Sequence, residues 1–416
     1  MAPTTLRDER DGTPAVPAPP ADAQPGGGRA RAGGLRGFHP GWYGAVMGTA
    51  IIAIAAAMNP GQAAGAATTG RDAAEAFATL AALLGAGLAI LYVARVAFHP
   101  GAVWADLRDP VNGSLYATFP AGILILALMA DRVGPLVLPA GSILPLVESL
   151  GSLGMLLGFA LSIVHAHNLV VHPRVGPAAA FGGWFIPPVT NLVVPLVLLP
   201  LMPHVSAAAA RFLFALGYGF WGMGMLLFVL VAVQVYDRLV VHPLPHPSLS
   251  PATWIFLGPI GVGSIALVQM AQAGQPLFGT AAQSVRMLSL LGATALWGFG
   301  IWAFALAGLL LLHYLRRGPI PFGPGWWAFT FPLGAFTVDT LVLARAWNVG
   351  SLEVAGAALF LLLVVFWAVV VAGTMWSWRG AVRSRPMPEQ RGAPPNGRES
   401  GAALLGMDPS PRTGTE

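Results

Sequence analysis

The stretch Phe329-Thr330-Phe331-Pro332-Leu333-Gly334 carries the pattern that decides the fold, because similar stretches recur at a nearly constant interval. Three earlier stretches also place proline inside an apolar run close to a phenylalanine: Thr118-Phe119-Pro120-Ala121-Gly122, Phe185-Ile186-Pro187-Pro188 and Phe256-Leu257-Gly258-Pro259-Ile260-Gly261. The motif prolines are Pro120, Pro187, Pro259 and Pro332, and one further period before Pro120 lies Gly48, where the pattern has glycine instead. The sequence therefore predicts an internal repeat of about seventy residues.

Every copy of this pattern lies in an apolar segment that could cross a membrane. A bilayer core requires about 20 helical residues. Ten such segments are expected near 41–58, 75–97, 114–130, 142–165, 178–201, 207–236, 252–271, 286–313, 325–345 and 353–378. The prolines fall in odd-numbered segments, so each repeat is a helical hairpin. We expect an all-α membrane protein whose ten transmembrane helices form five quasi-repeated hairpins.

The even-numbered segments also end alike. Three of them finish in Phe98-His99-Pro100, Val171-His172-Pro173 and Val241-His242-Pro243, which recur with the same period as the prolines. Proline cannot continue a helix, and histidine can bond to the last carbonyl groups. The sequence therefore predicts that these three helices end at the histidines, and it contains no histidine spacing typical of a metal site.

The composition indicates a protein whose solvent is lipid. Of 416 residues, 56% are hydrophobic and only 9% are charged, whereas soluble domains carry charge on about a quarter of their residues. Cysteine is absent, which excludes disulfides and thiolate metal sites. The chain has no paired catalytic acids and no nucleophile motif, so we expect no enzyme, no cofactor and no metal. A membrane-embedded enzyme is the least favoured class of function.

The two ends of the chain differ from the middle. Residues 1–36 and 379–416 are rich in proline, glycine and charge, so we expect disordered tails on either side of a transmembrane domain of residues 37–378. If both tails are cytoplasmic, seventeen arginines lie on that side and five on the other, as the positive-inside rule requires. We therefore expect a multi-pass protein of the inner, cytoplasmic membrane with both termini in the cytoplasm. The excess of arginines that gives the net charge of +5 is then explained by the orientation of the protein in the membrane. Nucleic acid is therefore not an expected partner.

The repeated prolines suggest a passage through the molecule. Proline inside a helix removes an N–H donor and clashes with the carbonyl four residues earlier, and a freed carbonyl in hydrocarbon needs protein or water as a partner. We predict that the odd-numbered helices face inward and bend at five positions that line a central pore, while the even-numbered helices face lipid. The predicted positions are Gly48, Pro120, Pro187, Pro259 and Pro332. The alternative is a solid bundle with ordinary packing kinks.

Four stretches together carry a resemblance to a known family. They are Gly41-Trp42-Tyr43-Gly44-Ala45-Val46-Met47-Gly48-Thr49, Asp106-Leu107-Arg108-Asp109-Pro110 with the following Ala117-Thr118-Phe119-Pro120, Gly183-Trp184-Phe185-Ile186-Pro187-Pro188, and Trp326-Trp327-Ala328-Phe329-Thr330-Phe331-Pro332. Over residues 38–378 the chain resembles the tellurite-resistance/dicarboxylate transporter family, which includes TehA-like proteins, fungal malate permeases, sulfite efflux pumps and slow anion channels of plants. The resemblance implies an inner-helix pore for small anions such as C4-dicarboxylates, sulfite or tellurite, and commonly a homotrimer. No motif separates these substrate branches.

The resemblance also implies a gate. In this family a phenylalanine on the ninth helix plugs the pore, and the motif position matches Phe331, with Phe329 as the second candidate. An aromatic ring on an inward-facing helix can close a narrow passage by its bulk and by dewetting. The alternative is that both rings belong to the packed core.

Two acidic residues inside the segments are candidate proton or charge sites, because an intramembrane carboxylate is a functional hypothesis by default. Glu148 lies in the fourth segment, and Asp339 lies in the ninth, within two turns of Arg345. A local pair between Asp339 and Arg345 near the outer mouth is the favoured interpretation of that residue. Glu148 would carry the proton in the alternative function, a proton-coupled secondary carrier of dicarboxylates.

Overall fold

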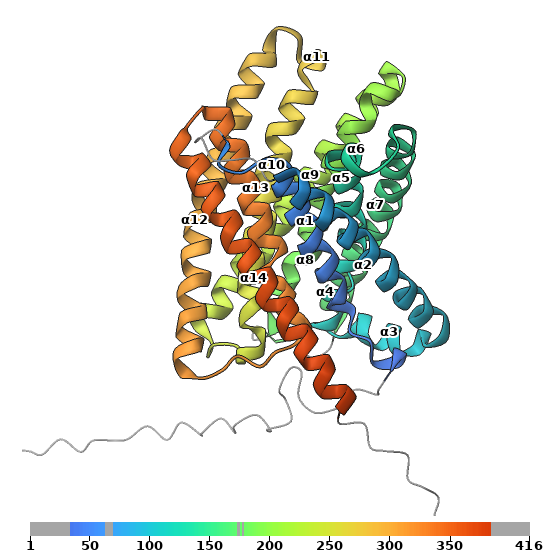
Figure 1. Cartoon of the computed structure of the whole chain (residues 1–416), viewed down its shortest axis with the longest axis vertical. Coiled ribbons are helices and arrows are strands. Elements are labelled where there is room, and N and C mark those ends of the chain that lie inside the picture. Colours follow the sequence, from blue (N-terminus) through green and yellow to red (C-terminus); the bar gives the residue numbers. More distant parts are fainter. Residues whose placement is uncertain (1–33, 63–69, 173–174, 177–178, 384–416) are drawn as a thin grey trace, which may run out of the picture. The chain divides into compact units, whose positions relative to one another are not determined.

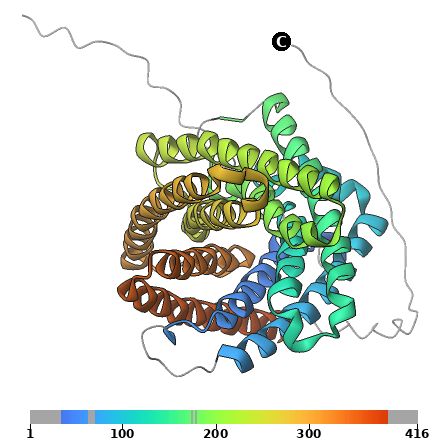
Figure 2. The ribbon, with the colours of Figure 1, turned by 90° about the horizontal axis from the view of Figure 1, so that it is seen from above.

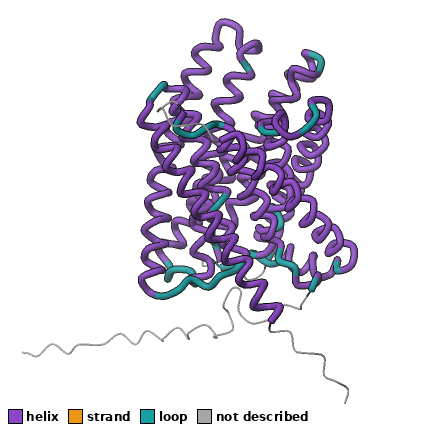
Figure 3. Tube along the Cα trace, in the orientation of Figure 1, coloured by secondary structure: helices purple, strands orange, loops and turns teal. Residues whose placement is uncertain are grey.

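The structure is a computed structural model that describes residues 34–62, 70–172, 175–176 and 179–383, with side chains to residue 379. The predicted tails therefore lie almost entirely outside the described residues. The chain divides into two units, Met1–Thr374 and Met375–Glu416, and all contacts given below lie within the first. In the described ranges the regular structure is helical, without a β-strand (Figures 1 and 3).

Ten helices of the described chain are long and apolar enough to span a membrane, which confirms the predicted number. The odd-numbered spans contain the inner helices α1 (Gly44–Ala57), α5 (Thr118–Arg132), α8 (Ile186–Leu198), α10 (Leu257–Ala273) and α13 (Phe331–Trp347). The even-numbered spans contain the outer helices α2 (Gly70–Phe98), α7 (Ala140–Val171), α9 (Ala207–Val241), α12 (Ala282–Arg317) and α14 (Gly350–Arg383). Short connecting helices are α3 (Pro100–Arg108), α6 (Gly134–Val137) and α11 (Gln275–Phe278), together with the 3-10 turns η1 (Leu35–Gly37) and η8 (Gly279–Ala281).

The two sets of spans differ sharply in burial. In the most apolar window of each odd-numbered span, 83–89% of the residues are buried, against 17–28% in the even-numbered spans. Such a difference is expected when one set of helices packs only against protein and the other set faces lipid. The inner and outer layers that the repeat predicted are therefore present within the first unit.

The inner helices form a closed ring. Each contacts the next in chain order, from α1 through α5, α8 and α10 to α13, and α13 contacts α1. Figure 2 shows the helices of the first unit following one another around a common centre in the order of their colours. Each of the first four inner helices also packs against the outer helix that follows it in the chain, α2, α7, α9 and α12 respectively.

Each inner span is interrupted in its first half. A short segment comes first: η2 (Pro40–Tyr43), α4 (Asn112–Leu115), η5 (Gly182–Phe185), η7 (Pro247–Phe256) or η9 (Pro324–Phe329). The α-helix then begins at Gly44, Thr118, Ile186, Leu257 or Phe331. These starting points are again about seventy residues apart, as expected for copies of one structural unit. The interruption therefore repeats with the same period as the motif.

The motif prolines lie at this interruption rather than in the middle of α-helices, which corrects their predicted placement. Pro120 and Pro259 are the third residues of α5 and α10, and Pro187 and Pro332 are the second residues of α8 and α13. In a first turn the N–H groups have no partner within the helix, so proline removes no bond there. The motif prolines therefore lie in the first turns of the inner helices.

The carbonyl groups expected to be freed are largely satisfied. Those of Tyr116, Gly183 and Ile255 each accept a backbone N–H from two or three residues further along. The tighter turn of the preceding segment supplies these bonds, as 3-10 turns commonly do at helix ends. These three carbonyl groups therefore need no water-filled pore to supply a hydrogen-bond donor.

Glycine permits the closest approach between inner helices. A Cβ atom on Gly261 of α10 would lie 2.7 Å from the backbone carbon of Ala335 in α13. A Cβ atom on Gly334 of α13 would overlap the side chain of Ile51 in α1. Small residues at such crossings let helix backbones come together in membranes, and here they hold α13 against both of its neighbours in the ring.

Candidate functional site

Two adjoining cavities lie along the inner ring. The upper cavity, with a volume of about 600 Å³, is lined by the C-terminal ends of the inner helices and by residues of α12 near its start. The lower cavity, of about 350 Å³, is lined by residues of all five inner helices. The two cavities adjoin, because five lining residues are common to both: Met58, Arg132, Gln269, Val342 and Arg345.

The lower cavity is apolar over most of its wall. Its wall includes Ile51 and Ile54 of α1, Ile125 and Leu128 of α5, Leu196 of α8, Val262 and Ile265 of α10, and Ala335 and Val338 of α13. On α13 the lining residues Phe331, Ala335, Val338, Val342 and Arg345 are three or four positions apart, so they share one helix face. Between the first and the last of them the helix rises by about 21 Å.

Phe331 lies at the deep end of this helix face. It is the first residue of α13, its exposed fraction is 4%, and it belongs to the apolar cluster that surrounds the lower cavity. No aromatic ring among the described residues contacts it. The second candidate, Phe329, does not line either cavity; its ring packs edge-on against Trp254, Trp326 and Phe366 at centroid distances of 5.5–5.7 Å.

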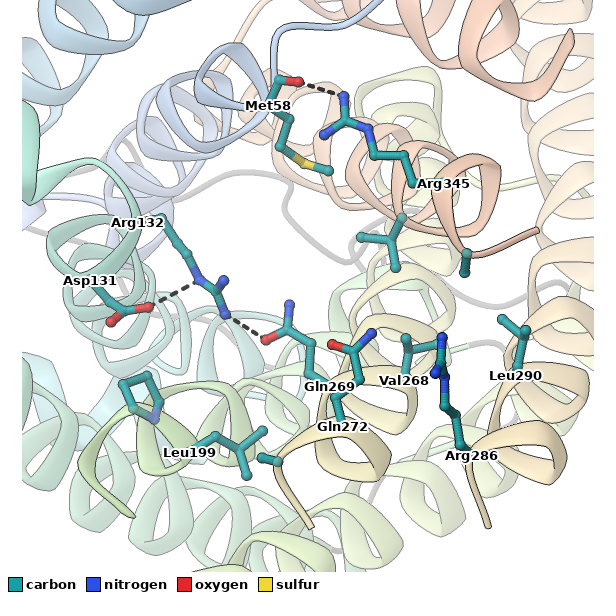
Figure 4. A pocket seen from close by; sticks show the side chains of 14 residues that line it. Met58, Asp131, Arg132, Leu199, Val268, Gln269, Gln272, Arg286, Leu290 and Arg345 are labelled. Atoms are coloured by element: carbon teal, nitrogen blue, oxygen red, sulfur yellow. Dashed lines mark hydrogen bonds and ion pairs between the residues drawn. The ribbon is translucent and has the colours of Figure 1, made fainter. Parts of the chain in front are cut away.

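The upper cavity has more polar side chains in its wall than the lower cavity. Three arginines from different helices line it, Arg132 of α5, Arg286 of α12 and Arg345 of α13, together with Gln269 and Gln272 of α10. Figure 4 shows the arginines on three sides of the cavity, with the two glutamines between Arg132 and Arg286. Guanidinium and amide groups are hydrogen-bond donors suited to anions, so this group of side chains favours negative charge in the upper cavity.

Two of the arginines are held by carboxylates. Arg132 Nε contacts Asp131 Oδ2 at 3.0 Å, and its Nη2 donates to Gln269 Oε1 at 2.6 Å. Arg345 Nη2 contacts Oε1 of Glu353 at 2.9 Å and also donates to the carbonyl of Met58. The Glu353 side chain is only 1% exposed, so this ion pair joins the end of α13 to the start of α14.

Asp339 does not pair with Arg345, which corrects the favoured interpretation of that residue. Its side chain is fully buried and does not line either cavity. Ser264 of α10 donates to Asp339 Oδ1 at 2.5 Å, and Oδ2 has no hydrogen-bond partner among the described residues. Arg345 instead has its acidic partner in Glu353, on the helix that follows.

Glu148 also lies away from the cavities. It is exposed on the outer helix α7 and has no ion pair in the described part of the chain. The five predicted bend positions, Gly48 and the four prolines, do not line either cavity. A Cβ atom on Gly48 would overlap the Thr330 hydroxyl group, so this glycine makes room for the start of α13. No group of three or more potential metal ligands occurs within the described residues.

The polar residues of the upper cavity were not identified from the sequence, although the repeat contains a signal for them. Three of them follow their motif prolines by almost the same length of helix, Arg132 after Pro120, Gln272 after Pro259 and Arg345 after Pro332. Counting residues from each motif proline therefore predicts that the inner helices end at the same depth and that these three side chains lie at that depth. Arg286 lies at the start of the predicted eighth segment and has no such register.

Comparison with known proteins places the chain in a family. The family model described as SLAC1, voltage-dependent anion channel, matches residues 37–375, which include the whole inner ring and both cavities. The chain belongs to the SLAC1 family. It is therefore a multi-pass membrane protein of a family of anion channels and transporters, as the resemblance implied.

Two of three named relatives of this SLAC1-family chain cover most of its length. An uncharacterized transporter of Methanocaldococcus jannaschii is 29% identical over 341 residues, which are 82% of this chain and 93% of the relative. The sulfite efflux pump SSU1 of Arthroderma otae is 26% identical over 361 residues, 82% of this chain and 91% of the pump. The malic acid transport protein of Schizosaccharomyces pombe is 28% identical over 162 residues, 37% of this chain and 36% of that protein.

Proposed function

We propose that this chain conducts small anions through the ring of inner helices and that Phe331 gates the passage. The observation that carries the proposal is a pair of adjoining cavities, which share five lining residues and together extend from three arginines at one end to Phe331 at the other. All five inner helices contribute to their walls, as expected when five quasi-repeated hairpins surround one pore.

The chemistry of the wall supports conduction better than tight binding. Arginine at a mouth raises the local concentration of anions, and an apolar lower wall offers a permeating ion few partners that would retain it. Conduction requires binding weak enough for the ion to leave. The named relatives support sulfite or a dicarboxylate such as malate as the transported anion.

A gate at Phe331 is supported by its surroundings. Its side chain lies among aliphatic residues of the lower cavity, where a change of rotamer breaks no aromatic contact. Phe329 is fixed by three ring contacts outside the cavity, so the proposal assigns the gate to Phe331 alone.

The experiment is anion flux in vesicles reconstituted with the purified protein. Phe331→Ala should raise the flux about ten-fold, which corresponds to a barrier lowered by about 1.4 kcal/mol. Phe329→Ala is the matched control, because it removes the same ring two residues away but outside the passage, and its flux should equal that of the wild type. An unchanged flux in folded Phe331→Ala protein rejects the gate.

Orientation and assembly belong to the same proposal. With both termini in the cytoplasm of a cell with an inner membrane, the inner helices begin on the cytoplasmic side and the arginine-lined mouth opens on the opposite side. The homotrimer implied by the family resemblance stays a prediction, which the mass of the detergent-solubilised protein would test.

A further inference from the structure

The upper cavity contains one guanidinium group whose charge is not compensated. Asp131 balances Arg132, and Glu353 balances Arg345, at 3.0 and 2.9 Å respectively. Arg286 is exposed on α12 and makes no hydrogen bond or ion pair with any residue in the described ranges. The cavity wall and its bonded carboxylates therefore carry one net positive charge, located at Arg286.

Arg132 also fixes the direction of a neighbouring amide. A guanidinium has only donors, so the Gln269 oxygen that lies 2.6 Å from Arg132 Nη2 accepts a hydrogen bond. The Gln269 amide N–H groups must then point away from Arg132, and in Figure 4 the amide nitrogen faces the open cavity. Gln272 lies three residues further along α10, on the same helix face, and like Arg286 it lines the upper cavity.

The ends of the helices favour the same location. α5, α10 and α13 finish at this cavity, and the C-terminal end of a helix carries partial negative charge, which Arg132 and Arg345 offset in their last turns. Arg286 is instead the fifth residue of α12, near a helix N-terminus with partial positive charge. Negative charge is therefore stabilised on the side of Arg286.

We propose that Arg286, with the amide groups of Gln269 and Gln272, forms a capture site for a singly charged oxyanion, such as a carboxylate or bisulfite-type ion. This inference deepens the proposed function and rests on it. A guanidinium offers two parallel N–H groups to two oxygens of one ion, and the amides add donors to the same ion. One uncompensated positive charge matches one negative charge, whereas a dianion would leave excess charge facing the apolar lower cavity. Of sulfite and malate, the site would therefore take the singly protonated, singly charged form.

Binding can be measured without flux. A ligand that binds only the folded protein raises its unfolding temperature, so we would follow thermal unfolding of the purified full chain with sodium acetate at constant ionic strength. Arg286→Gln should raise the half-maximal acetate concentration about ten-fold, the usual scale for one charge-assisted hydrogen bond. Arg286→Lys should recover part of the affinity, and Gln269→Leu should also weaken it.

The matched control is Arg211→Gln. Arg211 lies at the start of α9, on the same side of the inner ring but outside the cavity, so it tests the loss of one positive charge in general. Equal acetate affinity in the Arg286→Gln and Arg211→Gln proteins would overturn the site. Stronger stabilisation by sulfate than by acetate would overturn its preference for a singly charged ion.

A flux measurement separates this inference from the proposed function. In vesicles that contain the Phe331→Ala protein, adding Arg286→Gln should raise the half-saturating acetate concentration from the mouth side. If Phe331→Ala fails to raise flux but Arg286→Gln still raises the half-maximal acetate concentration for stabilisation, the gate is rejected and the capture site stands. If neither substitution has its effect, both proposals are rejected.

Discussion

Phe331 and Phe329 are two residues apart, yet their surroundings differ in a way that bears on mechanism. Phe331 begins α13 and reaches the lower cavity among aliphatic side chains, whereas Phe329 ends η9 and is held by three aromatic rings. The sequence favoured Phe331 because it adjoins the motif proline, and that proline marks the start of the inner helix. The register of the helix start therefore decides which ring faces the passage.

The arginines were harder to interpret from the sequence. Arg132, Arg286 and Arg345 lie at the ends of apolar segments, where arginine commonly serves orientation. Which of them face a common cavity depends on how three separate helices end in space, and sequence spacing within one hairpin does not give that. The same limit explains Asp339, whose partner Ser264 lies one full repeat away on α10.

Glu148 supplies a prediction at this scale. Glu148→Gln should leave anion flux within about two-fold of the wild type. The residue is exposed on α7 and does not line either cavity, and an exposed charge at a distance from the permeating ion is screened by salt. The measurement is flux in vesicles with and without a pH gradient. Loss of flux in a folded Glu148→Gln protein would instead favour the proton-coupled carrier.

At the scale of elements, hydrophobic length and the histidine-proline endings gave a close account of the helices. α2, α7 and α9 end at Phe98, Val171 and Val241, immediately before the predicted histidines. The interruption of each inner span was placed less well, because proline is compatible both with a bend and with a first turn. The preceding 3-10 turns decide between these two, and their hydrogen bonds are not visible in the spacing of prolines.

The contact between α10 and α13 can be tested directly. Gly261→Ala places a Cβ atom 2.7 Å from the Ala335 backbone, so the helices must separate, and we expect a loss of about 1–3 kcal/mol of stability. Gly308→Ala on α12 is the control, since nothing lies within 4 Å of the added atom and alanine is the better helix former. Thermal unfolding in detergent compares the two. Equal unfolding temperatures would show that α10 and α13 can move apart without loss of stability, against this prediction.

At the scale of the whole first unit, the closed ring follows from the repeat. Each hairpin has one mostly buried and one mostly exposed helix, and a helix buried on every side needs neighbours on both flanks. Five hairpins in chain order provide those neighbours when the fifth inner helix returns to the first. The period predicted a hairpin unit in five copies around a central axis, and the contact of α13 with α1 is what closes the inner ring.

The direction of the passage can be tested because the chain has no cysteine. Ala281→Cys places a thiol in η8, near the arginine-lined mouth, and Ser248→Cys places one in η7, at the opposite ends of the inner helices. In intact cells a membrane-impermeant maleimide should label the first variant and reach the second only after permeabilisation. The reverse labelling would place the mouth on the cytoplasmic side.

The five α-helices of the ring begin with unlike residues, Gly44, Thr118, Ile186, Leu257 and Phe331, and this inequality has a mechanical consequence. If five equivalent side chains closed the pore, all five would have to move together to open it. If Phe331 alone closes it, the obstruction lies on one side of the pore. A rotamer change of that one side chain then opens the pore without movement of the helix backbones. Rotamer changes are among the fastest motions that proteins make, so the limiting event in opening would be whatever first loosens the packing around that one ring.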